Sequence, residues 1–382
     1  GVADPEVFGV DHLIYRVQGP GPMSLNPPPG IDFFLGDLSR VQVIHPLTGE
    51  ILESRDFNAG LFQNFAATDP AGNVVVQDIG RIQKFDQGLR ERLWITDLTS
   101  EVGEALLEAT PAGSIGFTPD GSIVLPFLSG DIFVLDPVDG AVLSHIQLTH
   151  LDPPVAADPQ YGSGTYLRNA VAMDGDRLFF LVQGEMVVMD HRPTDHRLEV
   201  VDRAAYTGFS SSTPTLDTAG RRLFLVSFEP DQPQRAPMLR CFDYASLPMS
   251  EKWAVEAEIA VLDSEDQLTS TLVGDDLLVN NALYGSVSAY QIRSDGSGAD
   301  LLWDAKDTVG GEPMMYIASA SNDDRMLYVF DNATRTLYGL AADTGEVRWT
   351  YPITAQSIKK PIPYRGTVLL DHNEGLVSLV AD

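Results

Sequence analysis

A single cysteine, Cys241, occurs in the 382 residues of the chain. One cysteine excludes an intramolecular disulfide and any cysteine-rich metal centre. Because Cys241 stands in the alternating apolar run MLRCFDY, we expect it to be a buried strand residue. Runs of 18 apolar residues are also absent, so the sequence predicts no transmembrane span.

Basic residues are scarce: 25 Lys and Arg face 54 Asp and Glu, which gives a formal net charge of −29. This acidic charge repels polyanions and excludes nucleic acid as a favourable partner. The first residues, GVADPEVF, lack the basic and apolar regions of a signal peptide. A leader removed before Gly1 fits this pattern, and a lipid anchor on that leader stays open.

Two catalytic signatures are missing, the metal-binding HExxH and the nucleophile elbow GxSxG. Of the seven histidines, His145 and His150 are five residues apart, as are His191 and His196. Strand residues five apart point to opposite faces, so the first pair should not share an ion. The second pair flanks a Pro-containing turn, where a metal site is one reading and solvated turn residues are the favoured one.

Acidic turns such as DGDR (174–177), DPAGN (69–73) and SNDDR (321–325) also raise the question of calcium. A calcium loop needs alternating oxygen ligands and a closing glutamate, and none of these turns has both. Asp, Asn and Gly tolerate the left-handed backbone of tight turns. We therefore interpret these segments as hairpin turns.

Strand patterns fill the chain, and 101–109 is the only short helical candidate. A small-residue strand, an acidic or glycine turn and a strongly apolar strand recur, as in GSIGFTPDGSIVLPF (113–127). The apolar second strands begin near Phe33, Val74, Ile123, Leu178, Leu223, Leu277, Leu327 and Val368. Eight units in 382 residues give about 48 residues each, close to the ~40–50 of a four-stranded propeller blade.

The four tryptophans all fall at the end of such a unit, and we expect each to dock against the neighbouring blade: Trp94, Trp253, Trp303 and Trp349. The last unit stops before its fourth strand, whereas the strand-like run 12–17 has no unit of its own. We therefore predict an all-β, eight-bladed propeller of four-stranded antiparallel blades, a single domain over 1–382. In it, residues 1–30 supply a closing strand and a Pro-rich connector, and the N-terminal strand completes the last blade and removes the open sheet edges.

The segment LYGLAADTGEVRW (337–349) resembles the repeat of the pyrroloquinoline-quinone (PQQ) dehydrogenases and their non-enzymatic relatives, Ala-x-Asp-x-x-Thr-Gly-x-x-x-Trp. Thr344, Gly345 and Trp349 match this motif, while Gly339 and Ala341 replace its Ala and Asp. The resemblance implies a propeller whose tryptophans dock between blades.

The family contains two kinds of protein. Its dehydrogenases bind PQQ with calcium in the central channel, and many place a vicinal cysteine pair over the cofactor. The lone Cys241 rules out that pair, and about 48 residues per blade leave little for covering loops. The resemblance and the short blades therefore favour the second kind, which binds no cofactor and acts as a docking scaffold.

The sequence thus predicts a non-catalytic, secreted or periplasmic binding scaffold with a protein partner or small ligand on a propeller face, and without cofactor or metal. The alternative is a PQQ- or metal-dependent oxidoreductase with its site in the channel. First-strand positions should face that channel, and the candidates that line it are Phe65, Phe117, Arg168, Asn169, Thr213, Thr271 and Tyr316.

Overall fold

The computed structural model describes residues 14–18, 38–45, 48–58, 66–78, 80–102, 115–127, 129–148, 167, 171–182, 184–208, 210, 214–229, 236–257, 268–282, 287–309, 316–321, 325–331, 334–354, 361–364, 367–372 and 375–380. Within these ranges the strands form eight sheets, six with four strands and two with three, and every recorded pairing is antiparallel. The predicted all-β class is confirmed, and so are the four-stranded antiparallel units for six of the eight sheets.

The described residues gather into two compact units. Unit 1 takes them from 1–150, 164–182 and 188–201, and unit 2 from 183–187 and 202–382. The strands of the first three sheets are β1 (Ile14–Gln18), β2 (Leu38–Ile44) and β3 (Ile51–Asn58); β4 (Ala66–Thr68), β5 (Val74–Asp78), β6 (Arg81–Phe85) and β7 (Arg92–Asp97); and β8 (Gly116–Phe117), β9 (Ile123–Pro126), β10 (Asp131–Leu135) and β11 (Val142–Gln147). The single turn of helix α1 (Thr99–Val102) follows β7 and covers the start of the predicted helical segment.

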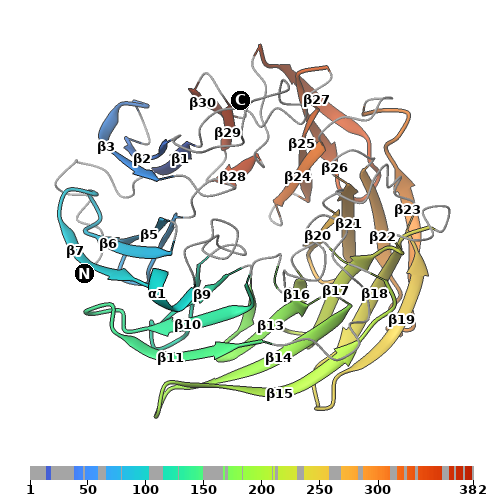
Figure 1. The fold of residues 1–382 in the computed structure, drawn as a ribbon. Coiled ribbons are helices and arrows are strands. Elements are labelled where there is room, and N and C mark those ends of the chain that lie inside the picture. The colour runs from blue at the N-terminus through green and yellow to red at the C-terminus, as the bar shows by residue number, and fades with distance from the viewer. Residues whose placement is uncertain are drawn as a thin grey trace, which may run out of the picture. The chain divides into compact units, whose positions relative to one another are not determined.

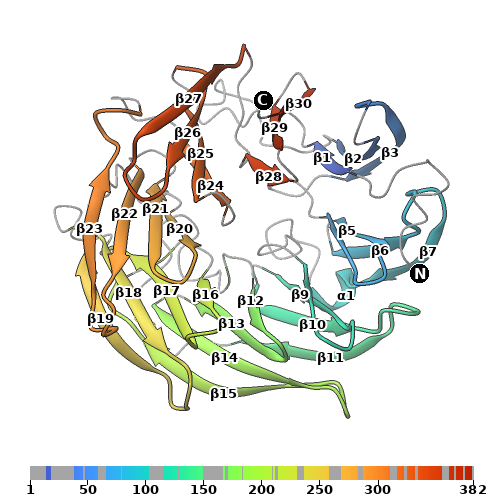
Figure 2. The same cartoon turned by 180° about the vertical axis from the view of Figure 1, so that it is seen from behind.

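The fourth sheet contributes residues to both units, and its strands are β12 (Ala172–Asp174), β13 (Arg177–Val182), β14 (Glu185–Arg192) and β15 (Arg197–Ala205). Unit 2 holds the rest: β16 (Thr215–Asp217), β17 (Arg222–Ser227), β18 (Met238–Asp243) and β19 (Ser250–Glu256); β20 (Leu268–Val273), β21 (Leu277–Ala282), β22 (Val287–Ile292) and β23 (Ala299–Asp304); β24 (Tyr316–Ser321), β25 (Met326–Asp331), β26 (Thr336–Ala341) and β27 (Val347–Pro352); and β28 (Ile362–Tyr364), β29 (Thr367–His372) and β30 (Gly375–Val380). Figures 1 and 2 show successive sheets of unit 2 side by side, with β16, β20 and β24 as neighbouring first strands.

The second strand of each repeat lies where the sequence predicts it. Seven of the eight expected starts fall within one residue of β5, β9, β13, β17, β21, β25 or β29, and Phe33 lies outside the described residues. β5 is buried at all five positions. The fourth strand of the same sheet, β7, is mostly exposed instead, and Trp94 is its one buried residue. The unbroken apolar runs therefore mark strands covered on both faces.

The pairing of the N-terminal strand corrects one expectation. β1 pairs with β2 in the register Ile14 to Ile44, so it belongs to the first sheet. Residues 12–17 were expected to complete the last sheet, which holds only β28, β29 and β30 among its described strands. The backbone groups of β2 left free by β3 are satisfied by β1, a nearby segment in the chain. Local pairing replaces the long-range pairing that we inferred from strand counting.

Four-residue turns connect the third and fourth strands of several sheets. Asp136 and Ala141 close one of them by a 2.8 Å backbone hydrogen bond, and Gly140, its last residue, has φ = 76°. Ala341 and Glu346 close another at 2.9 Å, with Gly345 at φ = 68°. Glycine adopts this left-handed conformation without steric cost. The Thr-Gly and Asp-Gly pairs of the repeat are therefore turn residues, as the sequence predicts.

Candidate functional site

Two of the seven predicted channel residues are fully described. Phe117 in β8 packs, partly buried, against a core cluster of unit 1, and Thr271 in β20 is half-buried in unit 2. Tyr316 begins β24, and nothing is described of its side chain. The other four lie outside the described residues: Phe65, Arg168, Asn169 and Thr213. The channel site of these seven residues stays a prediction.

The tryptophans lie on fourth strands, and two of them make the same contact with the following sheet. The indole Nε1 of Trp94 in β7 donates a hydrogen bond to the carbonyl oxygen of Pro137 at 3.3 Å. Trp303 in β23 donates to the carbonyl oxygen of Ala342 at 2.8 Å. Pro137 and Ala342 are both the first residue of the glycine-ended turn. Each indole thus ties its own sheet to the next third-to-fourth-strand turn.

The turn glycine gives these indoles the space they occupy. A Cβ on Gly140 would lie 2.6 Å from Cε3 of Trp94, and one on Gly345 would lie 2.7 Å from Cδ2 of Trp303. Both distances are shorter than any carbon–carbon contact allows. The position therefore requires glycine for two reasons. Its backbone is left-handed, and a side chain there would collide with the neighbouring indole ring.

The other two tryptophans pack mainly by apolar contact. Trp253 is 7% exposed and belongs to a cluster that includes Leu278 and Tyr290 of the following sheet. Trp349 packs against a cluster that includes Leu370 of the following sheet. Cys241 is buried in the same cluster as Trp253, as predicted from its apolar run. Burial raises the pKa of its thiol to about 12.

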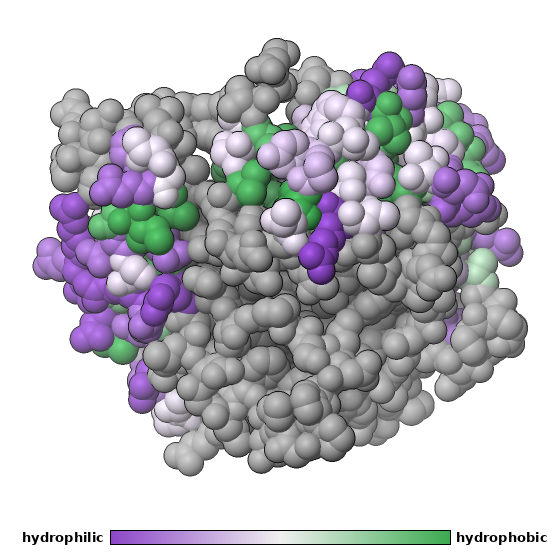
Figure 3. All heavy atoms as spheres, turned by 90° about the horizontal axis from the view of Figure 1, so that it is seen from above, coloured by the Kyte–Doolittle hydropathy of each residue, from purple (hydrophilic) through white to green (hydrophobic). Residues whose placement is uncertain are grey.

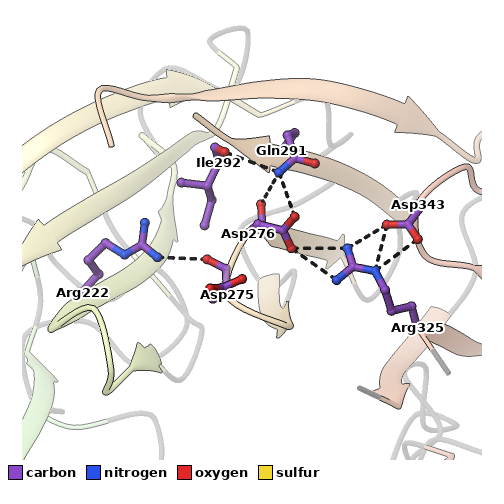
Figure 4. Close-up of polar contacts among 7 residues, drawn as sticks. All are labelled: Arg222, Asp275, Asp276, Gln291, Ile292, Arg325 and Asp343. Carbon is purple, nitrogen blue, oxygen red and sulfur yellow. Dashed lines mark hydrogen bonds and ion pairs between the residues drawn. The ribbon is translucent and has the colours of Figure 1, made fainter. Parts of the chain in front are cut away.

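A polar network joins three successive sheets of unit 2 (Figure 4). Arg325, just before β25, reaches Asp276 in the turn between β20 and β21, with Nη1 3.3 Å from Oδ1. The same guanidinium binds Asp343 in the turn after β26, with Nη2 2.7 Å and Nε 2.9 Å from Oδ1. Arg325 therefore bridges a carboxylate of the preceding sheet and one of its own. The hydrogen bond from Arg325 to Asp343 and the charge of Asp276 raise the pKa of the arginine further.

The network continues from Asp276 toward the fifth sheet. Gln291 in β22 donates from Nε2 to the backbone oxygen of Asp276 at 3.0 Å and to its Oδ2 at 3.2 Å. Arg222, the first residue of β17, donates from Nη2 to the backbone oxygen of Asp275 at 3.0 Å. Its charge is balanced by Asp217, whose buried carboxylate accepts from Nε at 2.7 Å. We call these residues the arginine–aspartate network: Arg222, Asp217, Asp275, Asp276, Gln291, Arg325 and Asp343.

The arginines of the network stand at a repeated position that sequence reasoning overlooked. Arg177, Arg222 and Arg325 each precede or begin the second strand, in DRLFF, RRLFL and DRMLY. Arg177 makes a bidentate pair with Asp190, at 2.8 and 3.0 Å. An arginine before an apolar strand in three units was the available signal.

Unit 1 carries a more buried ion pair, between the third strand β6 and the turn after β4. Lys84 Nζ lies 2.6 Å from Oδ2 of Asp69, and the two side chains are 8% and 3% exposed. Lys84 also donates to the carbonyl oxygen of Pro137 in the next sheet at 2.6 Å. Burial alone would raise the pKa of Asp69, but hydrogen bonds from Lys84 and Asn73 outweigh it and hold that pKa below its usual value.

The histidines divide into two kinds. His145 Nε2 lies 2.7 Å from Oδ1 of Asp131, and its ring stacks on Phe133 with centroids 4.2 Å apart. His150 lies outside the described residues. His191 and His196, in contrast, come together with Asp120, a residue that the sequence gave no reason to place near them.

Among the described residues, no helix is long and apolar enough to cross a bilayer. Figure 3 shows hydrophobic residues in separate groups bordered by hydrophilic ones on the described part of the face that it draws. Exposed apolar side chains such as Leu93, Val142 and Leu301 lie on fourth strands. Scattered residues of this kind are normal on a protein surface.

Residues 267–381 match the family model described as outer membrane protein assembly factor BamB. The crystal structure of BamB from Moraxella catarrhalis is similar over 89% of this chain and 90% of its own, with 15% identity and a TM-score of 0.61. Sqt1 of Saccharomyces cerevisiae covers 82% of this chain and 80% of its own, with 9% identity and a TM-score of 0.59. The C-terminal WD40 domain of Sif2 covers 90% of both chains, with 11% identity and a TM-score of 0.61. No curated protein matches the sequence.

These comparisons confirm the resemblance to the PQQ-like propeller repeat. The matched segment contains the motif at 337–349 from which the resemblance was inferred. At identities of 9 to 15%, the similar structures show the fold alone, and that fold is of the propeller type.

Proposed function

From a PQQ-like repeat and a propeller-type fold, we propose that this chain is a non-catalytic binding scaffold of the cell envelope. Its eight sheets are the blades of one propeller in this proposal, and its function is to dock a protein partner. The family whose model matches residues 267–381 is an outer membrane protein assembly factor, which supports a partner from the assembly of outer-membrane proteins. A periplasmic or outer-membrane-associated location follows from the same proposal.

The observation that carries the proposal is the cross-linking of successive sheets through their turns. Trp303 and Arg325 both join β20–β23 to β24–β27, one through a backbone carbonyl and one through Asp276. Arg222 joins β16–β19 to β20–β23 through the carbonyl of Asp275. Side chains that hold turns in this way fix the surface formed by the turns of Asp275, Asp276 and Asp343, here called the turn face, before a partner binds. Preorganisation of this kind reduces the conformational entropy lost on binding.

The charge of the turn face indicates the chemistry of the partner. Asp275 and Asp343 are exposed, and the chain as a whole has a net charge of −29. Complementary charge accelerates association and selects partners, and added salt screens it. The proposed partner therefore presents a basic segment to the turns of unit 2.

A photo-crosslinking experiment with the full chain and an envelope extract of the source organism tests the proposal. A photoreactive residue at position 343, in the turn face, should capture a protein of the outer-membrane assembly machinery. The same residue at position 301, exposed on the fourth strand β23, is the matched control and should capture little. Capture should fall when the salt concentration of the binding buffer rises to about 0.5 M, where the Debye length is only a few ångströms.

Two results would replace the proposal. Equal capture from positions 343 and 301, or none from either, would remove the turn face as the docking surface. Turnover of a dye-linked alcohol by the full chain after loading with PQQ and calcium would favour the oxidoreductase alternative. A new absorbance band on adding PQQ at micromolar concentration would support that alternative as well.

A further inference from the structure

Three side chains from two adjacent sheets of unit 1 converge on one point. Asp120 lies in the turn between β8 and β9, His191 is in β14, and His196 ends the turn between β14 and β15. One ring nitrogen of each histidine and one carboxylate oxygen of Asp120 lie within 4.8 Å of one another. We propose that these residues bind a divalent transition-metal ion, preferably zinc, and that the bound ion links the two sheets.

His191 is oriented as a metal ligand. Its side chain is fully buried, and its Nδ1 lies 3.3 Å from Oδ1 of Asp176. Its backbone nitrogen also donates to the backbone oxygen of Asp176 at 2.8 Å, which fixes the residue against that turn. A proton on Nδ1 shared with Asp176 leaves the lone pair of Nε2 free to bind a metal, the arrangement of a carboxylate–histidine–metal triad.

The other ring nitrogen of His191, Nε2, makes no hydrogen bond. It is buried, and Nδ1 of His196 is likewise buried without a hydrogen-bond partner. Leaving a buried polar atom unpaired costs about 1–3 kcal/mol, so native proteins rarely contain two side by side. A metal ion bound between these two nitrogens would satisfy both.

His196 occupies a position that glycine holds in other sheets. It is the last residue of turn 193–196 and has φ = 53°, as Gly140 and Gly345 end their turns at φ = 76° and 68°. A side chain in this conformation is strained by roughly 1–2 kcal/mol. The strained backbone directs the ring toward Asp120, whose Oδ2 lies 3.8 Å from Nδ1. That separation is too long for a hydrogen bond.

Asp120 presents a fixed and charged oxygen. Its Oδ1 accepts hydrogen bonds from the Thr118 hydroxyl and from the backbone nitrogen of Ser122, the latter at 3.2 Å. With Oδ1 engaged, Oδ2 remains for the ion.

Two imidazoles and one carboxylate select the metal by type. Imidazole favours zinc and its neighbours over calcium or magnesium, and three protein ligands leave one position for water. Bonds of about 2.0–2.1 Å put the ligand atoms of a tetrahedral zinc site roughly 3.4 Å apart. The ligand atoms lie within 4.8 Å of one another. Binding therefore needs the cluster to contract, by about 0.4 Å for the 3.8 Å separation of His196 and Asp120 and by up to about 1.4 Å for the other pairs.

The surroundings admit the ion and do not repel it. An open groove lined by Asp176, Arg177, Asp190 and residues 191–195 adjoins the cluster and offers a path from solvent. Arg177 is paired with Asp190, and Arg192 with Glu199, so the nearby cations are balanced by carboxylates.

Metal titration of the full chain tests the site. After chelator treatment, Zn²⁺ should bind with one-to-one stoichiometry by calorimetry and should not be displaced by a large excess of Mg²⁺. Co²⁺ should give visible absorption bands of a low-coordinate site. His196→Gln and Asp120→Asn should each weaken Zn²⁺ binding by more than the roughly 10- to 100-fold expected for the outer-shell change Asp176→Asn.

The controls separate this site from diffuse binding to an acidic surface. Asp195→Asn removes an exposed carboxylate from the same turn as His196, and His145→Gln removes a histidine already paired with Asp131. Both variants should bind Zn²⁺ as the wild type does. Equal binding by all variants, or no one-to-one binding by the wild type, would overturn the proposal. Urea unfolding of each variant identifies any that fails to fold, and the remaining variants then decide.

Discussion

Replacing Gly345 by alanine tests whether the turn glycine is required by its backbone or by the neighbouring tryptophan. Gly345 has φ = 68°, and a Cβ there would lie 2.7 Å from Trp303 Cδ2 and 2.8 Å from its Cε3. Gly49 ends an equivalent turn with φ = 72°, and a Cβ there would meet nothing within 4 Å among the described residues. The two glycines thus share a conformation and differ in what lies above them.

The expected magnitudes follow from this difference. Placing alanine in the left-handed region costs roughly 1–2 kcal/mol, and this cost applies to both positions. Forcing a methyl group into the packed indole adds about 1–3 kcal/mol at position 345 only. Gly49→Ala should therefore lower the free energy of unfolding by about 1–2 kcal/mol, and Gly345→Ala by about 2–5 kcal/mol.

Urea unfolding followed by circular dichroism measures both changes, with the free energies taken from midpoints and slopes. A double-mutant cycle then isolates the contact: in a Trp303→Ala background, Gly345→Ala should cost no more than Gly49→Ala does. Equal costs for the two glycine variants in the wild-type background would refute the reasoning. So would an unchanged cost of Gly345→Ala after the indole is removed.

Three further predictions concern the ion pairs and the thiol. Lys84→Ala should destabilise the protein by about 3–5 kcal/mol at pH 7, because it leaves the buried carboxylate of Asp69 unpaired. The pKa of Asp69 is lowered in the folded state, so its stabilisation is present above the unfolded pKa of about 3.9 and is lost as the pH falls further. The difference in the free energy of unfolding between wild type and variant, measured in urea, should therefore shrink in that acid range. A difference that stays constant with pH would contradict the pairing. Arg325→Leu should cost only about 0.5–2 kcal/mol, since its two pairs are partly exposed, and the loss should be smaller at 1 M salt. Cys241, whose pKa burial raises to about 12, should resist thiol reagents at pH 8 in the native protein and react after unfolding; rapid native labelling would contradict its burial.

Regular features of the repeat were predictable because they depend on neighbours in the chain. Alternation and apolar runs located the second strands from Val74 to Val368, and the glycine turns followed from their two-residue signals. The pairing of residues 14–18 was not predictable in this way. A short apolar strand without its own unit fits either end of a repeat array, and only the register with β2 distinguishes them.

Side-chain contacts between sheets were harder to infer. Arg325 and Asp276 are 49 residues apart, about one repeat, and nothing local marks them as partners. The arginine position recurs in three units, but its carboxylate partner comes from a different place each time: Asp190 for Arg177, Asp217 for Arg222, and Asp343 with Asp276 for Arg325. A charge pattern therefore predicts that a pair forms without predicting which one.

The contact between a tryptophan and the glycine of the next turn explains why not every third-to-fourth-strand turn ends in glycine. In the second sheet, Trp94 of β7 lies opposite Lys84 of β6, next to a shift in the strand register. The third-to-fourth-strand turn of the following sheet must therefore end in glycine, Gly140, to leave space for the indole. In the third sheet, Ser144 holds the corresponding place opposite Val134. A serine does not fill the space above the following turn, and its hydroxyl instead lies 3.4 Å from the backbone nitrogen of Leu198.

The turn 193–196 of the fourth sheet therefore has space for a side chain at its last position, which is His196. Without an indole above, the cost of a side chain there falls to that of the left-handed backbone, roughly 1–2 kcal/mol. Ser144→Trp should restore the constraint: the introduced indole would press on His196, and Zn²⁺ binding should weaken at least tenfold while His196→Gly in the same background recovers stability but not metal binding. Undiminished Zn²⁺ binding by Ser144→Trp would show that the space above turn 193–196 does not depend on residue 144.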